Sequence, residues 1–125
     1  MNLSPRVLIV ESDLTDLQML WLALGRAGLP LDAATTAADG LRLARLTRYG
    51  AIVASSEARD REGLELCGRI RAELGDRAPL FICVSSEAMP EDLDRARLAG
   101  CDHYLTKPVT LRQIVSLALE GVGGG

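Results

Sequence analysis

Short apolar runs alternate with amphipathic stretches along the chain, and polar or glycine residues separate them. The runs at 6–10, 51–54 and 79–84 are too short for helices and end in turn residues. Such runs are typical of strands buried on both faces of a sheet. Weaker strands are predicted at 31–35, at an edge of the sheet, and at 102–106.

Five helices are predicted from apolar positions at helical spacing, at 14–27, 36–48, 62–74, 90–99 and 110–120. Thr36 with Asp39, and Thr110 with Gln113, have the spacing of capping boxes, while Asp13 or Ser12 can cap the first helix. The first helix has an apolar stripe that is expected to face inward, and two apolar residues off that stripe are expected to be exposed. The inward stripe is Leu14, Leu17, Trp21 and Leu24, and the exposed pair is Met19 and Leu22.

Strict alternation of strands and helices, joined by short loops, predicts an α/β domain with a parallel sheet and helices on both faces. For one domain of this size, the expected strand order is 2-1-3-4-5, a flavodoxin-like arrangement. The domain is predicted to cover residues 1–121, and the glycine-rich residues 122–125 are interpreted as a flexible tail or the stump of a linker.

The composition of the chain argues against several classes of function. The chain has 125 residues, a net charge of −3 and a pI near 5.1, which argues against nucleic acid as a direct ligand. There is no run long enough for a membrane helix and no signal peptide pattern, so a cytoplasmic location is expected. Three cysteines without Cys-x-x-Cys spacing are interpreted as small buried hydrophobes in a reducing compartment. They are Cys67, Cys83 and Cys101.

Polar side chains follow the ends of several predicted strands. Parallel strands bring their carboxyl ends to one edge of the sheet, where sites of α/β proteins lie. Five residues are therefore expected to share one pocket. They are Glu11, Ser12, Ser55, Ser85 and Lys107. Lys107 is the single lysine beside thirteen arginines, which suggests a position that needs a compact ammonium.

These residues resemble the receiver domain of bacterial two-component response regulators over essentially the whole chain. The matching stretches are Val7 to Glu11, Gly63 to Leu66, the hydroxyl of Ser85, Ala99-Gly100, and Tyr104 to Pro108. The resemblance implies a phosphorelay signalling role, a Mg²⁺ site made of three carboxylates, and a phospho-accepting aspartate after the third strand. It also implies a switch pair, which is Ser85 and Tyr104 in this sequence.

The sequence departs from that family pattern at the decisive positions. Ser55 occupies the phosphoacceptor position, Ser12 replaces the second acid of the first strand, and Ala58-Arg59 replaces a Met-Pro pair. A serine cannot form an acyl phosphate and is a poor nucleophile without a neighbouring base. Mg²⁺ binding is expected to be lost or weak, because Glu11 is the one family carboxylate that remains.

We therefore interpret the chain as a pseudo-receiver: a signalling module without catalytic residues, cofactor or metal that binds a protein partner independently of phosphorylation. The expected contact face consists of the fourth helix, fifth strand and fifth helix, with no membrane or direct nucleic acid partner and an undetermined oligomeric state. Glu11 and Lys107 are expected to pair directly. The alternatives are an active receiver using Asp13 or Glu57, and, ranked last, a hydrolase with Ser55 as nucleophile.

Overall fold

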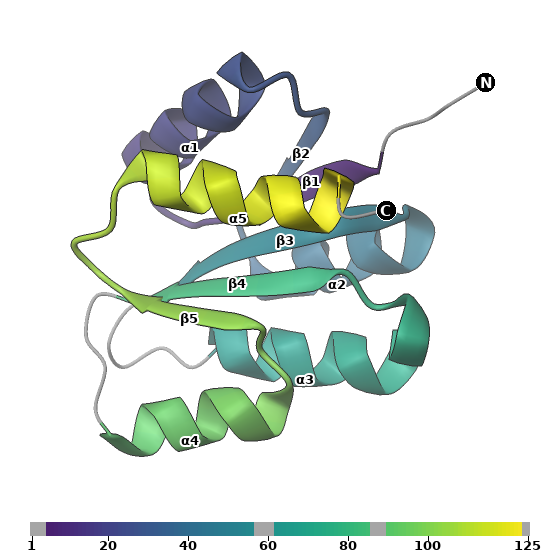
Figure 1. The fold of residues 1–125 in the computed structure, drawn as a ribbon. Helices are drawn as coiled ribbons and strands as arrows, with labels where there is room; N and C mark the ends of the chain where they lie inside the picture. Colours follow the sequence, from purple (N-terminus) through teal and green to yellow (C-terminus); the bar gives the residue numbers. More distant parts are fainter. Residues whose placement is uncertain (1–4, 57–61, 86–89, 124–125) are drawn as a thin grey trace.

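The fold is a five-stranded parallel sheet between two layers of helices, seen in a computed structural model that describes residues 5–56, 62–85 and 90–123 (Figure 1). The strands are β1 (Arg6–Val10), β2 (Leu31–Ala34), β3 (Tyr49–Ser56), β4 (Leu80–Ser85) and β5 (His103–Thr106). The helices are α1 (Leu14–Arg26), α2 (Ala37–Leu46), α3 (Glu62–Leu74), α4 (Pro90–Ala99) and α5 (Leu111–Gly123), with a 3₁₀ turn, η1 (Gly75–Arg77), after α3. The strand order is 2-1-3-4-5, so the predicted fold and the edge position of β2 are confirmed.

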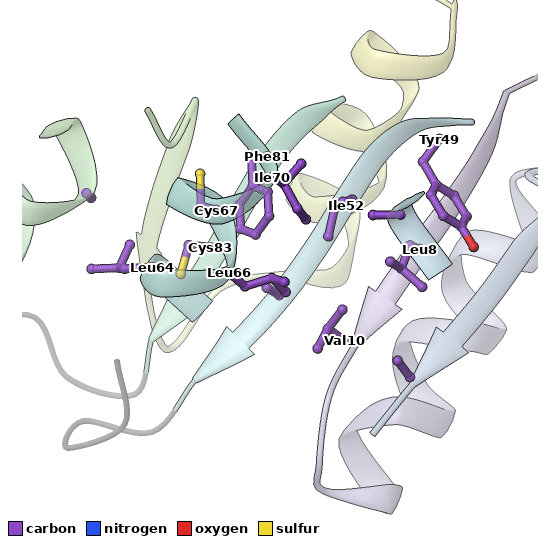
Figure 2. Close-up of a cluster of buried hydrophobic side chains, with 14 residues drawn as sticks. Leu8, Val10, Tyr49, Ile52, Leu64, Leu66, Cys67, Ile70, Phe81 and Cys83 are labelled. Atoms are coloured by element: carbon purple, nitrogen blue, oxygen red, sulfur yellow. The ribbon is translucent and has the colours of Figure 1, made fainter. Parts of the chain in front are cut away.

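Alternate residues of the central strands pack on opposite faces of the sheet, as the period of a strand requires. Leu8, Ile52 and Phe81 face α2, α3 and α4, where they join a buried cluster (Figure 2). Val7, Val53 and Ile82 face α1 and α5 on the other side. The central strands are apolar throughout because both of their faces are covered.

The caps of three helices agree with the sequence patterns. Asp13 is the N-cap of α1, and its carboxylate accepts a hydrogen bond from Asp16 N at 2.9 Å. The Thr36 hydroxyl accepts from Asp39 N at 3.1 Å. The Thr110 hydroxyl accepts from Gln113 N at 3.1 Å. Each cap satisfies one backbone donor that the first turn of a helix leaves free.

The predicted inner stripe of α1 is wrong at two positions. Leu14 and Trp21 are 66% and 44% exposed, whereas Leu20 and Leu24 are buried. At 100° per residue, a stripe through Leu20 and Leu24 lies next to the predicted one and shares Leu24 with it. The prediction that Met19 and Leu22 are exposed is confirmed, at 49% and 59%.

Several element boundaries also differ from the prediction by one or two residues, including the end of β3, which is at Ser56 instead of 54. Helix α2 ends at Leu46 instead of 48, and β3 begins at Tyr49 instead of 51. Tyr49 belongs to the sheet because its side chain is buried and its hydroxyl donates to the Asp32 carboxylate at 2.8 Å. The pairing of β1 with β3 shifts register between Arg6 and Val7, which leaves Gly50 outside the ladder.

Helix α5 continues through Gly123, further than the predicted domain end at 121, so the first residues of the expected tail are helical. Within this last part of the helix, at Gly121, α5 crosses β3 at very close range. A Cβ added to Gly121 would lie 2.5 Å from Gly50 O and 3.0 Å from the Cβ of Ala51. A glycine is required at this crossing because no side chain fits between the two backbones.

We expect Gly121→Ala to lower the free energy of unfolding by about 1–3 kcal/mol, because the added methyl group forces α5 away from β3. Gly123→Ala is the matched control in the same helix, since nothing lies within 4 Å of its added Cβ. That control should be neutral or stabilising by up to about 1 kcal/mol. Urea unfolding of both variants measures the difference, and equal stability of the two would show that the crossing tolerates a side chain.

Candidate functional site

The carboxyl ends of β1 and β3 place Glu11 and Ser55 at the same edge of the sheet. Val10 and Ala54 are register partners, so the residues that follow them lie side by side. Glu11 is 5% exposed and Ser55 is half-buried. Both residues line two neighbouring cavities, one of about 380 Å³ and one of about 30 Å³. They form the centre of the candidate site.

The other predicted site residues lie in different places around Glu11 and Ser55. Ser12 lines the smaller cavity with Thr36 and Gly63, and Lys107 lines the larger one. Ser85 is 2% exposed and follows Val84, the register partner of Ser55. Its carbonyl oxygen accepts a hydrogen bond from Lys107 N at 2.8 Å. The predicted residues thus lie at one edge, distributed over two cavities and a buried strand end.

The predicted ion pair between Glu11 and Lys107 is wrong. Lys107 Nζ lies 3.5 Å from the Asp16 carboxylate, which the first turn of α1 directs toward it. Glu11 Oε2 instead accepts a hydrogen bond from Asp13 N at 3.2 Å. Sequence reasoning missed Asp16 as a residue of the site, although its place one turn into α1, near the end of β1, is the signal that could have found it.

The larger cavity has a mainly apolar wall. Met19 and Leu20 from α1, and Leu111 and Ile114 from α5, line it. Lys107 and Asp16 also line this cavity, and Lys107 precedes Pro108 in a cis peptide. Both partners of that pair are partly exposed, at 34% and 46% of their side chains, so its contribution to stability is small.

Ser85 and Tyr104 are in contact across β4 and β5. Tyr104 is half-buried and packs against the cluster on the α3 side of the sheet. Burial raises the pKa of the Tyr104 hydroxyl, and a hydrogen bond with Ser85 offsets part of this increase. The two side chains therefore form a pair linking the buried strand end to the β5 surface.

The oxygen atoms at the centre of the site offer few of the ligands that Mg²⁺ requires. This ion prefers carboxylate oxygens and keeps several waters. Glu11 provides one carboxylate, and its Oε2 is already hydrogen-bonded to the backbone. Ser12 and Ser55 contribute neutral hydroxyls. This set fits the ion poorly. The replacement Ala58-Arg59 and the alternative acceptor Glu57 lie outside the described residues.

The receiver-domain family model matches residues 7–119. The chain belongs to the response regulator receiver domain family. Receiver domains are mainly signalling modules that interact with protein partners such as kinases and effectors, and they typically bind Mg²⁺ at their active site. No helix of the described residues is both long and apolar enough to cross a membrane.

Relatives and solved structures agree with this assignment. The transcriptional regulatory protein PrrA of Mycobacterium leprae is 33% identical over 114 residues, which cover 90% of this chain and 48% of PrrA. This receiver therefore spans about half the length of that relative. A CheY-like receiver domain from Methanospirillum hungatei is 25% identical and superposes with a TM-score of 0.86, covering 98% of this chain and 96% of that one.

A further fold neighbour carries a metal. The receiver domain of the sensor histidine kinase PA1611 from Pseudomonas aeruginosa has a magnesium ion coordinated in its active site cleft. It is 21% identical, with a TM-score of 0.81 and coverage of 97% of this chain and 99% of that one. At this identity the likeness concerns the fold, and the metal is a property of that protein.

Proposed function

We propose that this receiver is a pseudo-receiver that acts through phosphorylation-independent contact with a protein partner. The observation that carries the proposal is the hydroxyl of Ser55 at the end of β3, where the family has an aspartate. A phosphoryl group on that aspartate is an acyl phosphate, which a serine cannot form. The absence of a second carboxylate at Ser12 supports the same conclusion.

The substitute acceptor Asp13 has another role in the described structure. Its carboxylate caps α1 by accepting from Asp16 N, and a capping side chain is typically worth about 1 kcal/mol. Phosphorylation of Asp13 would have to give up this bond. We therefore place the active-receiver alternative second. A hydrolase with Ser55 as nucleophile is third, because no histidine adjoins Ser55 in the described residues.

The proposed contact face consists of α4, β5 and α5. It carries the half-buried ring of Tyr104 and exposed leucines on both helices, which are Leu93, Leu98 and Leu119. Tyr104 connects this face to the buried end of β4 through Ser85. A partner that binds only one arrangement of the Ser85–Tyr104 pair would shift the population toward that arrangement. Such a shift would give a switch that needs no phosphate.

We expect Leu98→Glu and Tyr104→Ala to reduce binding of the physiological partner at least about tenfold, equal to about 1.4 kcal/mol, since each removes apolar contact area. Ser55→Ala should leave binding unchanged. Leu46→Glu is the matched control, because Leu46 at the end of α2 is 76% exposed and Leu98 is 88% exposed. Quantitative pull-down from lysate of the source organism measures the effects, and partner loss with Ser55→Ala or Leu46→Glu alone would contradict the proposed face.

A further inference from the structure

The larger of the two cavities beside Glu11 has the size of a small-molecule site. Much of its wall comes from α1 and α5, which lie side by side on one face of the sheet (Figure 1). Its volume of about 380 Å³ falls within the range of roughly 300–1,000 Å³ that such sites occupy. Asp16, Met19 and Lys107 line it with partly exposed side chains, so one side of the cavity faces solvent. A ligand can therefore reach it without unfolding of the domain.

Glu11 is the buried charged residue of this cavity, at 5% exposure. Its Oε2 accepts a hydrogen bond from Asp13 N at 3.2 Å, whereas Oε1 has no hydrogen bond within the described residues. No side-chain oxygen of those residues is both fully buried and without a partner, so Oε1 must reach accessible space. The Lys107 ammonium lies 3.5 Å from the Asp16 carboxylate instead of pairing with Glu11. A buried carboxylate without a cationic partner is costly, and a cation from outside would compensate for that cost.

The charges along the cavity wall favour a positively charged ligand. The formal charges of Glu11, Asp16 and Lys107 leave one net negative charge at neutral pH. Lys107 and Asp16 neutralise each other, so this net charge belongs to Glu11. Because one carboxylate oxygen of Glu11 is already bonded, a compact ammonium suits it better than a guanidinium, which prefers to bind both oxygens at once.

The rest of the wall determines the remainder of the ligand. It consists mainly of aliphatic side chains, which are Leu20, Val84, Val109, Leu111 and Ile114. The second cavity at Glu11 is only about 30 Å³, which is room for about two water molecules. The apolar part of a ligand bound at Glu11 must therefore lie in the larger cavity, against these aliphatic side chains.

We propose that this cavity binds a small apolar molecule that carries one primary ammonium group. The ammonium donates a hydrogen bond to Glu11 Oε1, and the apolar body packs between Leu20 of α1 and Ile114 of α5. The inference rests on the proposed function, because a Mg²⁺ ion at Glu11 would compete for the same carboxylate. It adds to that function a ligand for the site where other receivers bind metal.

Three probes with the same phenyl-terminated chain and different head groups test this inference. They are phenylbutylamine, phenylbutanol and phenylbutyrate, and amide NMR titration of the native chain measures the dissociation constant of each. We expect the amine to bind with a dissociation constant of about 1 mM, at least about tenfold more tightly than the alcohol or the carboxylate. The amides of Leu20, Ser55 and Ile114 should shift. Equal binding of all three probes, preference for the carboxylate, or no saturable shift with the amine would overturn the inference.

Two lysine variants of α1 test the location and the sign of the charge. Met19→Lys places a competing ammonium on the cavity wall and should weaken amine binding at least about tenfold. Leu22→Lys is the matched control, because it makes the same change of charge on the same helix at an exposed position outside the cavity lining. Both positions are exposed, at 49% and 59%, so both variants should fold. Equal amine affinity in the two variants would overturn the inference.

Glu11→Gln retains the shape of the side chain and removes its charge. It should weaken binding of phenylbutylamine about tenfold, and the amide spectrum shows whether the variant is folded. Undiminished amine binding in folded Glu11→Gln would overturn the inference. If the variant does not fold, the lysine pair still decides, since neither of its substitutions touches the buried carboxylate.

Competition with Mg²⁺ distinguishes failure of this inference from failure of the proposed function. NaCl at equal ionic strength controls for screening. If MgCl₂ displaced the amine and NaCl did not, the cavity would be a ligand site, and the proposed loss of metal binding would be wrong. If the amine did not bind and acetyl phosphate left no adduct, the pseudo-receiver proposal would stand and this inference would be wrong.

Discussion

Incubation of the native chain with Mg²⁺ and acetyl phosphate should leave its intact mass unchanged. Ser55 has a hydroxyl where acyl phosphate formation requires a carboxylate, and no histidine lines either of the two cavities beside it to activate that hydroxyl. An adduct on a variant with the acidic residues restored would show that acetyl phosphate can serve as the donor, so the absence of an adduct on the native chain would then report on the acceptor. The expected difference is all or none, which makes this the sharpest test of the proposed function.

The double variant Ser12→Asp, Ser55→Asp is the positive control. It restores carboxylates beside Glu11 and retains Lys107 and Ser85, so it should gain one phosphoryl group that hydroxylamine removes. Ser12→Asn, Ser55→Asn has nearly the same shape without the charges and should gain none. The two variants therefore separate the chemistry of the acceptor from any change in the shape of the cavities.

An adduct on the native chain would contradict the pseudo-receiver proposal, and its chemistry would show how. A hydroxylamine-sensitive adduct that peptide mapping places on Asp13 or Glu57 would restore the active-receiver alternative. A hydroxylamine-resistant adduct on Ser55 would indicate a serine phosphate ester. The mass and the hydroxylamine response together distinguish all three results.

Most of the fold was predictable because the residues that are buried in each strand or helix appear in the sequence as a recognisable pattern of apolar positions. The apolar runs around Ile52 and Phe81 fit strands covered on both faces, and the caps at Thr36 and Thr110 are local interactions encoded within three residues. The errors occurred where tertiary contacts decide. Tyr49 extends β3 through its bond to Asp32, which is distant in sequence. Helix α5 extends through Gly123 while Gly121 packs against Gly50 of β3, which is distant in sequence.

The site was predictable as a location and less so as a set of contacts. Topology alone brings the ends of β1 and β3 together, so Glu11 and Ser55 were found from their positions after apolar runs. Side-chain pairing depends on directions that the sequence pattern does not contain. Glu11 therefore turns to Asp13 N, while Lys107 reaches Asp16.

Rebuilding the acidic cluster should also create Mg²⁺-dependent stability that the native chain lacks. In Ser12→Asp, Ser55→Asp, three carboxylates including the buried Glu11 would face one another, and their repulsion should destabilise the fold without a cation. A metal that binds only the folded state adds stability by mass action, by about 2.7 kcal/mol at one hundred times its dissociation constant. Mg²⁺ should therefore stabilise this variant strongly and the native chain little.

Urea unfolding of the native chain and both double variants, with and without saturating MgCl₂, measures this effect. The Asn variant should behave like the native chain, because amide and hydroxyl oxygens without charge do not compensate for dehydration of Mg²⁺. NaCl at equal ionic strength separates specific binding from screening of repulsion. If Mg²⁺ stabilised the native chain as much as the Asp variant, one carboxylate with two hydroxyls would suffice, and the loss of metal binding that we propose would be wrong.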